Sequence, residues 1–340
     1  MRSELFSGEQ LVRHAKSLAS AHQTTLSESS NQLLKRLASN EEILRHFNGV
    51  AASAAKGEQM TPAAAWLLDN FYLIEEQIQL ARRHLPRGYS RELPRLLTGE
   101  SAGLPRVYDI VLELISHTDA QIDSGSLTSF VAAYQKVHSL KLGELWAIPI
   151  MLRLGLIENL QRIASRLLAA QVDRDLAAEW VTKLQEMADE DPSLLVVVVA
   201  DMAKSELPLS SSFVAEFCQC LSRQSPTLHL ARSWLEQRLA GLGLSIEQLV
   251  HEESQNQAAA QVSVSHSLAS LRFLTEADWR EFVENLSLVD ATLRNDPADV
   301  YSGMNFATRD HYRHAVETIA RSSGLEEPEV ARRTVVLASA

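Results

Sequence analysis

Apolar side chains recur at helical spacing along most of the chain. In residues 61–78 they lie three and four residues apart, so that they share one face of a helix. The members of this stripe are Leu67, Phe71, Ile74 and Ile78. Two further stripes are Tyr108, Val111, Leu112 and Ile115 after Pro105, and Tyr312, Ala315, Val316 and Ile319 before Gly324. The pattern predicts amphipathic helices, with Gly324 closing the last of them.

Short polar motifs mark where helices should begin or end. A side-chain acceptor followed by proline predicts a helix start, because proline at the first helical position loses no hydrogen bond. Such pairs are Thr61-Pro62, Asp191-Pro192 and Asp296-Pro297. Ser245 with Gln248 fits a capping box, and Thr275 with Asp278 is a looser version of it. Asn48-Gly49 follows a helical pattern and is expected to end that helix.

Two segments resemble strands, but we predict that both are helical. Residues 262–268 alternate in polarity, yet no helix breaker separates them from the preceding helical pattern. Residues 194–199 are rich in valine, yet a helix cap precedes them. Glycine and proline are scarce, at 13 and 10 in 340 residues, and they cluster in residues 87–105, where an ordered loop is expected.

The predicted fold class is therefore all-α, a multi-helix bundle or irregular helical array with two helical lobes. The predicted segments are an N-terminal helical segment (1–55), a first helical lobe (56–170), a less distinctive helical connector (171–244) and a C-terminal helical lobe (245–340). Within the connector, residues 171–212 are more polar and irregular than their neighbours, which makes them the predicted seam between the lobes. No repeat of solenoid length is visible.

Charge and composition narrow the partners. The chain has 32 Lys and Arg against 43 Asp and Glu, which gives a net charge of −11 and disfavours nucleic acid and anionic lipid as partners. Its longest apolar runs, 145–152 and 194–200, are shorter than the roughly 20 residues of a membrane-spanning helix. Cys218 and Cys220 have no second pair, so they predict neither a zinc site nor a disulfide framework. These features favour a reducing, cytoplasmic location.

Several residues suggest chemistry that their surroundings do not support. Asp173-Arg-Asp175 and Asp189-Glu-Asp191 spell a metal-holding motif of glycosyltransferases, but neither follows a strand. His311 and His314 lie one helical turn apart without a third ligand at helical spacing. The residues of Ser265-His266-Ser267 point apart on a helix, so no catalytic triad follows. We predict no catalytic residue, no cofactor site and no metal site in this chain.

A charged pair flanks the most apolar stretch of the sequence. Glu144 and Arg153 bracket this stretch, and Pro149 is expected to kink or restart its helix. A charge next to so apolar a segment needs a partner. We therefore predict a buried ion pair between Glu144 and Arg153 with a structural role.

Long blocks of the sequence resemble the cyclic β-1,2-glucan synthases. They are residues 61–78 (beginning Thr-Pro-Ala-Ala-Ala-Trp), 85–96 (Leu-Pro-Arg-Gly-Tyr-Ser), 105–119 (Pro-Arg-Val-Tyr-Asp-Ile), 143–160 (Gly-Glu-Leu-Trp-Ala-Ile-Pro), 279–287 (Trp-Arg-Glu-Phe-Val-Glu) and 296–314 (Asp-Pro-Ala-Asp-Val-Tyr). The blocks follow the family's order and cover most of residues 60–335. Residues 170–240 are not distinctive, and the first 55 match only loosely.

The resemblance implies the N-terminal region of a long inner-membrane enzyme. In that family a glycosyltransferase module uses UDP-glucose and a divalent metal, membrane helices surround it, and a phosphorylase-like module trims the product. This chain has no Gln-x-x-Arg-Trp acceptor-site signature. It is therefore expected to be an accessory or scaffolding region without a cofactor of its own. The implied location is cytoplasmic, at the inner-membrane face, with the glycosyltransferase and membrane modules as partners.

Two alternatives remain open, and the sequence does not decide whether the chain is an enzyme. One is a β-1,2-glucan-binding module that uses exposed aromatic side chains, of which the candidates are Trp66, Tyr108 and Trp146. The other is a carbohydrate-active enzyme that uses Asp69 with Glu76, or Asp310 with His311. The candidate interaction surface consists of Asp69, Asn70, Arg106, Glu144, Arg309, Asp310 and Arg313.

Overall fold

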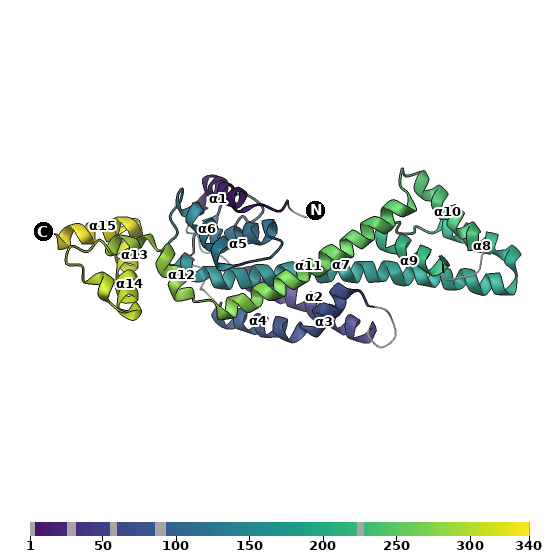
Figure 1. The fold of residues 1–340 in the computed structure, drawn as a ribbon, viewed down its shortest axis with the longest axis horizontal. Coiled ribbons are helices and arrows are strands. Elements are labelled where there is room, and N and C mark those ends of the chain that lie inside the picture. Colours follow the sequence, from purple (N-terminus) through teal and green to yellow (C-terminus); the bar gives the residue numbers. More distant parts are fainter. Residues whose placement is uncertain (1–3, 26–31, 55–59, 86–92, 223–227, 340) are drawn as a thin grey trace. The chain divides into compact units, whose positions relative to one another are not determined.

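The computed structural model describes residues 4–25, 32–54, 60–85, 93–222 and 228–339. Over these residues the chain forms fifteen α-helices and one two-stranded sheet, which confirms the predicted all-α fold class (Figure 1). None of the helices in this part of the chain combines the length and the hydropathy that crossing a bilayer requires.

The helices vary widely in length. They are α1 (Gly8–Ala21), α2 (Gln32–Ala54), α3 (Pro62–Asp69), α4 (Phe71–His84), α5 (Arg106–His117), α6 (Ser124–Gln135), α7 (Leu142–Glu190), α8 (Leu195–Lys204), α9 (Ser211–Ser222), α10 (His229–Ala240), α11 (Ile246–Glu276), α12 (Trp279–Leu286), α13 (Leu288–Leu293), α14 (Phe306–Ser323) and α15 (Glu327–Ala338). Two 3₁₀ helices are η2 (Pro192–Leu194) and η4 (Tyr301–Gly303).

One strand of the sheet lies in the predicted loop, and the other precedes α2. Strands β1 (Thr24–Thr25) and β2 (Arg95–Leu96) pair antiparallel, with Thr24 opposite Leu96. Residues 93–105 are ordered around this short ladder, as expected. The remainder of the predicted loop, residues 87–92, lies outside the described residues.

The chain divides into two compact units, each assembled from separate stretches of sequence. The first unit comprises Met1–Glu42, Asn70–Leu160 and Ser265–Ala340, and the second comprises Ile43–Asp69 and Gln161–Val264. The long helices α2, α7 and α11 contribute residues to both units. The predicted segment boundaries after residues 55, 170 and 244 all lie in stretches of the second unit, and the first part of the predicted seam, up to Glu190, is a continuation of α7.

Within the first unit, α1 packs against α6 and α5. The stripe after Pro105 faces inward, with Tyr108 and Val111 almost fully buried. Helices α5 and α7 meet at Gly155, where a Cβ atom would lie 2.7 Å from Cδ1 of Ile115. Glycine is therefore the residue that permits this approach of the two helices. Helix α7 also continues through Pro149, so the proline does not end it.

The second unit has an aliphatic core with a pair of stacked phenylalanine rings. Phe213 and Phe217 of α9 stack with ring centroids 5.7 Å apart. Helix α8 packs against α10, whose Leu235 and Leu239 are fully buried. Residues 194–199 belong to η2 and α8, and residues 262–268 belong to α11, so the prediction of helix is confirmed for both.

Several predicted helix ends are confirmed. Helix α3 begins at Pro62 with Thr61 Oγ1 accepting from the amide of Ala64, and η2 begins at Pro192 under a cap from Asp191. Ser245 and Gln248 exchange side-chain and backbone hydrogen bonds as a capping box requires. Gly324, with φ of +71°, closes α14 in the left-handed conformation that favours glycine.

Other predicted ends are wrong. Asp296-Pro297 starts no helix, because the Asp296 carboxylate instead accepts hydrogen bonds from the amides of residues 298, 300 and 301 and holds a turn. Asn48-Gly49 lies inside α2, and Thr275 lies inside α11, so that Asp278 alone caps α12. The stripe in residues 61–78 is buried, but the helix is divided at Asn70, whose side chain accepts a hydrogen bond from Arg272.

The last predicted stripe is also wrong in its orientation. Tyr312 and Ile319 are 46% and 50% exposed, whereas the buried face of α14 consists of Arg313, Val316 and Ala320. The helix is rotated away from the prediction because Arg313 has carboxylate partners inside the unit. A pattern based on apolar residues alone places such an arginine outside.

Candidate functional site

Buried ion pairs occupy the positions at which the sequence suggested an interaction surface. Arg106 begins α5, and its guanidinium donates two hydrogen bonds of 2.7 Å to the Glu144 carboxylate at the start of α7. It also donates to the backbone carbonyl of Ser139 at 2.7 Å. Arg106 is 7% exposed and Glu144 is 1% exposed. Burial alone would lower the pKa of Arg106, but the ion pair with Glu144 outweighs burial and raises it.

The prediction that Glu144 pairs with Arg153 is wrong. The two residues lie nine positions apart on one helix, so their side chains leave it in different directions. Arg153 instead donates from Nε to the side-chain oxygen of Gln77 on α4, at 2.7 Å. Burial lowers the pKa of the Arg153 guanidinium. Each residue therefore contacts a different partner, and the structural role of both stays a prediction.

A second ion-pair group joins α2, α5 and α7 within the first unit. Arg36 donates from Nη2 to both carboxylate oxygens of Glu158, at 2.9 and 3.0 Å. The hydroxyl of Tyr108 donates to the same carboxylate at 2.7 Å. Tyr108, a candidate sugar platform, is therefore a buried core residue.

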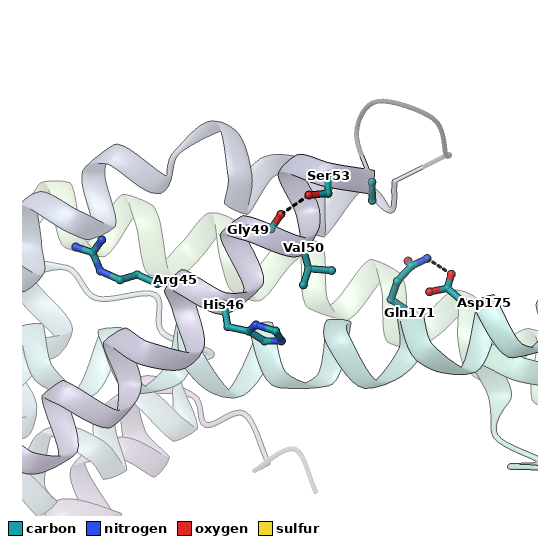
Figure 2. Close-up of a pocket in the computed structure, with 8 residues that line it drawn as sticks. Arg45, His46, Gly49, Val50, Ser53, Gln171 and Asp175 are labelled. Atoms are coloured by element: carbon teal, nitrogen blue, oxygen red, sulfur yellow. Dashed lines mark hydrogen bonds between the residues drawn. The ribbon is translucent and has the colours of Figure 1, made fainter.

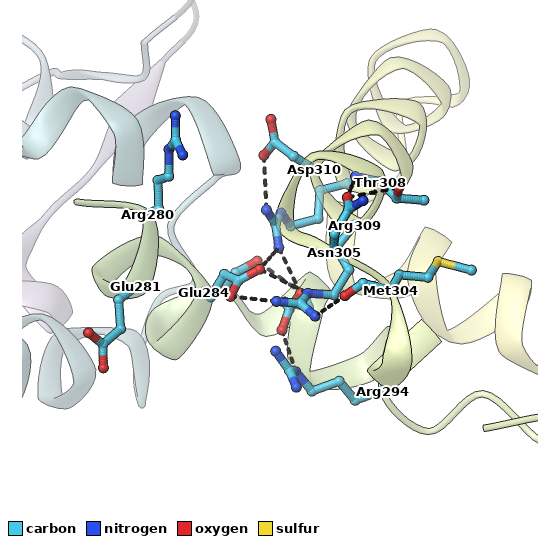
Figure 3. A network of polar contacts seen from close by, with 12 residues as sticks. Arg280, Glu281, Glu284, Arg294, Met304, Asn305, Thr308, Arg309 and Asp310 are labelled. Atoms are coloured by element: carbon cyan, nitrogen blue, oxygen red, sulfur yellow. Dashed lines mark hydrogen bonds and ion pairs between the residues drawn. The ribbon is translucent and has the colours of Figure 1, made fainter. Parts of the chain in front are cut away.

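The largest polar network surrounds Arg313 of α14 (Figure 3). Arg313 Nη1 donates to Glu284 at 3.0 Å and to Asp290 at 2.8 Å, and its Nη2 donates to Asp310 at 3.0 Å. Arg309 donates to both oxygens of Glu284 at 2.9 Å. The Arg313 side chain is fully buried, and so is nearly all of Asp290. This network, the Arg313 cluster, links α12, α13 and α14.

The Arg313 cluster is balanced in charge, although the buried Nε of Arg313 has no hydrogen-bond partner. Its third arginine, Arg294, donates to Asp290 at 2.6 Å, and the hydroxyl of Tyr301 donates to Asp290 at 2.9 Å. Three arginines thus face three carboxylates. Burial would raise the pKa of Asp290, but the hydrogen bonds from Arg294, Tyr301 and Arg313 lower it below its usual range. Arg280 and Glu281 of α12 point away from this network in Figure 3.

An open pocket of about 560 Å³ lies in the second unit, between α2 and α7 (Figure 2). Its polar rim includes Arg45 and His46 from α2, and Gln171 and Asp175 from α7. Gln171 donates to Asp175 one turn away at 2.7 Å, and Ser53 Oγ donates to the backbone carbonyl of Gly49 at 2.9 Å. The rim offers hydrogen-bonding groups for a polar ligand.

The remaining candidate motifs, the two Asp-x-Asp sequences and the pair His311 and His314, do not form the metal sites that their sequences suggest. Asp173 accepts from the hydroxyls of Ser210 and Ser212, at 2.6 and 3.1 Å, so it connects α7 to the start of α9. Asp191 caps η2. His314 is half exposed and lies 3.0 Å from Glu317 and 3.4 Å from Asp310, without a contribution from His311.

Comparison with known proteins gives one decisive observation. Over 290 residues, which are 85% of this chain, the sequence is 34% identical to the cyclic beta-(1,2)-glucan synthase NdvB of Rhizobium meliloti (strain 1021). The chain is homologous to a region of a cyclic β-1,2-glucan synthase. The match covers 10% of the Rhizobium synthase, so the chain spans about a tenth of the length of that relative. No family model matches the chain.

The synthase-homologous blocks contain most of the buried charges. Arg106, Glu144 and Arg313 lie in the blocks at residues 105–119, 143–160 and 296–314, and all three are buried. Four members of the predicted interaction surface are therefore buried. They are Asn70, Arg106, Glu144 and Arg313. Asp69 is exposed, and Arg309 and Asp310 are partly exposed.

The sequence analysis missed the partners of these charges. Glu284 lies in the block at 279–287 and Asp290 follows it closely, but nothing in their spacing shows that they face α14. It also missed a group of two histidines and a glutamate, His14, Glu113 and His117. The only local signal for this group is that Glu113 and His117 lie four residues apart on one helix.

Proposed function

We propose that this chain is a non-catalytic accessory region of a cyclic β-1,2-glucan synthase. Other modules of such a synthase would transfer glucose from UDP-glucose. The observation that carries the proposal is the 34% identity to the Rhizobium synthase over 85% of this chain, within one tenth of that protein. A match of that extent relates most of the chain to one region of a much longer enzyme.

The contacts of the charged residues support an accessory function for this chain. Carboxylates in or next to the blocks that resemble the synthases, which would suit acid–base chemistry, are engaged by arginines inside the first unit. Glu144 accepts from Arg106, and Asp290 accepts from Arg294, Tyr301 and Arg313. These contacts fix helices to one another. They suit a rigid body on which other modules are positioned.

The proposal includes a location and partners. The region would lie on the cytoplasmic face of the inner membrane, next to the glycosyltransferase and membrane modules. UDP-glucose and a divalent metal would bind in the transferase module, and the growing β-1,2-glucan would pass near this region. Partly exposed Arg309 and Asp310, at the edge of the Arg313 cluster, are the candidates for contact with another module.

An exchange experiment in the Rhizobium synthase tests the proposal. Its homologous region is either deleted or replaced by this chain, and membranes are assayed for glucan made from labelled UDP-glucose. We expect the deletion to lose glucan synthesis and the replacement to restore it, with comparable amounts of synthase in the membrane. Full synthesis by the deleted enzyme would overturn the proposal, and so would glucosyl transfer by this chain alone.

The pocket in the second unit favours glucan binding as a second candidate function. Its rim groups on α2 and α7 can hydrogen-bond to sugar hydroxyls, and Trp66 of α3, in the same unit, is 46% exposed. Titration of the chain with β-1,2-gluco-oligosaccharides tests it by calorimetry. Binding that weakens in Gln171→Ala, but not in Arg333→Ala, an exposed position of the first unit, would support this function. Absence of heat at millimolar sugar would exclude it.

A further inference from the structure

Two histidines and a glutamate converge on one point between α1 and α5 in the first unit. His14 projects from α1, while Glu113 and His117 project from successive turns of α5. One ligand atom from each of the three side chains lies within 4.8 Å of the other two. Glu113 Oε2 is 2.8 Å from His14 Nε2 and 3.4 Å from His117 Nε2. Both imidazoles therefore direct the same ring nitrogen toward one carboxylate oxygen.

The segment before α1 holds His117 in place. His117 Nδ1 lies 2.7 Å from the backbone carbonyl oxygen of Glu4, and the amide of Phe6 donates to the carbonyl of His117 at 3.0 Å. The Phe6 ring stacks on the imidazole with centroids 3.8 Å apart and planes 5° apart. These contacts restrict the rotation of the ring, as partners behind a metal-binding histidine do.

The hydrogen bond to Glu4 also fixes the tautomer of a neutral ring. A carbonyl oxygen only accepts, so Nδ1 of His117 carries the hydrogen. In the neutral imidazole, Nε2 then carries a lone pair, and this lone pair faces the Glu113 carboxylate at 3.4 Å. Two acceptors facing each other are unfavourable, whereas a cation bound between them is coordinated by both.

We propose that His14, Glu113 and His117 form a binding site for a divalent transition-metal ion such as Zn²⁺. Two imidazole nitrogens and one carboxylate oxygen are a set that zinc accepts, with water in the fourth position. The same set disfavours Mg²⁺ and Ca²⁺, which prefer oxygen ligands. The side chains are 25%, 34% and 14% exposed, so an ion can enter from solvent. The bound ion would connect α1 to α5. This inference does not depend on the proposed accessory function.

Another histidine of the first unit provides a matched comparison. His314 also lies near two carboxylates, those of Asp310 and Glu317, but it is 53% exposed and has no second histidine facing them. Its Nδ1 contacts Glu317 instead of a backbone carbonyl. His314 therefore has the local sequence features of a ligand without the geometry, and it is the control position.

Calorimetry with Zn²⁺ on the metal-stripped 340-residue chain tests the proposal. We expect one ion per chain, with affinity weakened at least tenfold in His14→Gln and in His117→Gln, since loss of even an outer-shell partner costs about 10–100-fold. His314→Gln should bind like the unsubstituted chain, and Mg²⁺ should not compete. Bound Co²⁺ should show the visible absorption of a four-coordinate site.

A measurement without substitutions keeps the test valid if a variant fails to fold. Histidine side-chain ¹H–¹⁵N spectra of the unsubstituted chain, recorded with and without Zn²⁺, should shift for His14 and His117 but not for His314. Failure of the unsubstituted chain to bind Zn²⁺ would overturn the proposal. Equal loss in His314→Gln and His117→Gln would overturn it as well.

Discussion

The two units of this chain are held together by different means. In the first unit the buried side chains include Arg106, Glu144, Asp290, Arg313 and Glu327, most of them in ion pairs. In the described part of the second unit, Glu253 is the charged side chain that is buried, and the core is otherwise aliphatic and aromatic. A buried charge needs its partner at a fixed point, whereas an apolar core accepts many combinations of similar volume.

The difference coincides with the placement of the sequence blocks that resemble the synthases. The blocks that resemble the synthases lie mainly in the first unit, and the indistinct residues 170–240 lie in the second. Arg313 contacts three carboxylates, so the ion pairs require a particular residue at each of four positions. Apolar side chains such as Leu235 exchange for others of similar size at small cost. The comparison suggests experiments that should affect one unit and spare the other.

Removal of the central arginine should have the largest effect. Arg313→Ala removes a fully buried arginine that contacts Glu284, Asp290 and Asp310 at once, so we expect a loss of about 3–5 kcal/mol of stability in the first unit. Hydrogen exchange measured by mass spectrometry should show this loss in α12–α14, with protection in α9 and α10 unchanged. The exposed Arg321, which pairs with Glu317 at 3.2 Å, is the control, and Arg321→Ala should cost less than about 1 kcal/mol.

An apolar truncation should have a comparable or slightly smaller effect, confined to the second unit. Leu235 is fully buried in α10, so Leu235→Ala should cost about 2–5 kcal/mol, whereas Leu235→Met should cost less than about 1.5 kcal/mol. Urea unfolding monitored by exchange in α8–α10 measures both. If Leu235→Met proves as damaging as Leu235→Ala, the core is less tolerant than the comparison requires.

The dependence of stability on pH should belong to the first unit. Glu327, at the start of α15, is 6% exposed and accepts from the amide of Leu142 at 2.9 Å. Burial, with added repulsion from Glu317 and Glu144, raises its pKa from 4.5 to about 7. Since the folded chain holds this proton more tightly than the unfolded chain, the stabilisation is complete below about pH 4.5 and declines until pH passes 7.

Glu327→Gln isolates that contribution. The variant cannot ionise at this position, so the difference in unfolding free energy between it and the unsubstituted chain should shift by about 3 kcal/mol between pH 4.5 and 8, in favour of the variant at high pH. Urea titrations at several pH values measure the shift. A difference that does not change with pH would show that Glu327 keeps an ordinary pKa.

A glycine substitution should have the smallest effect. Gly155→Ala places a methyl group against Ile115 and should cost about 1–3 kcal/mol through overpacking between α5 and α7. Gly49→Ala is the matched control, because it lies on α2 with no atom within 4 Å of the added methyl group. This control should stabilise by about 0.5–1 kcal/mol through helix propensity. Thermal unfolding distinguishes the two variants by the sign of the change.

Much of the fold could be predicted from the sequence, but the polar interior could not. Stripes such as Leu67 to Ile78, and caps such as Thr61 and Ser245, act over a few residues and are visible in the sequence. The orientation of α14 was mispredicted, because its inward face is set by Arg313 and carboxylates 23 and 29 residues away. His14 and Glu113 are 99 residues apart, so only the packing of α1 on α5 brings them together.

The central claim, that this region of the synthase is structural and not catalytic, can be tested most directly at its exposed acids. The test uses the Rhizobium synthase carrying this chain in place of its own region. There, the double changes Asp69→Asn with Glu76→Gln and Asp310→Asn with His311→Gln remove the groups on which an enzymatic role would depend. We predict that glucan synthesis from UDP-glucose stays within about twofold of the unsubstituted exchange. A loss of 10²-fold or more, with normal amounts of folded synthase, would contradict the account, since such a loss is the size expected for a general acid or base.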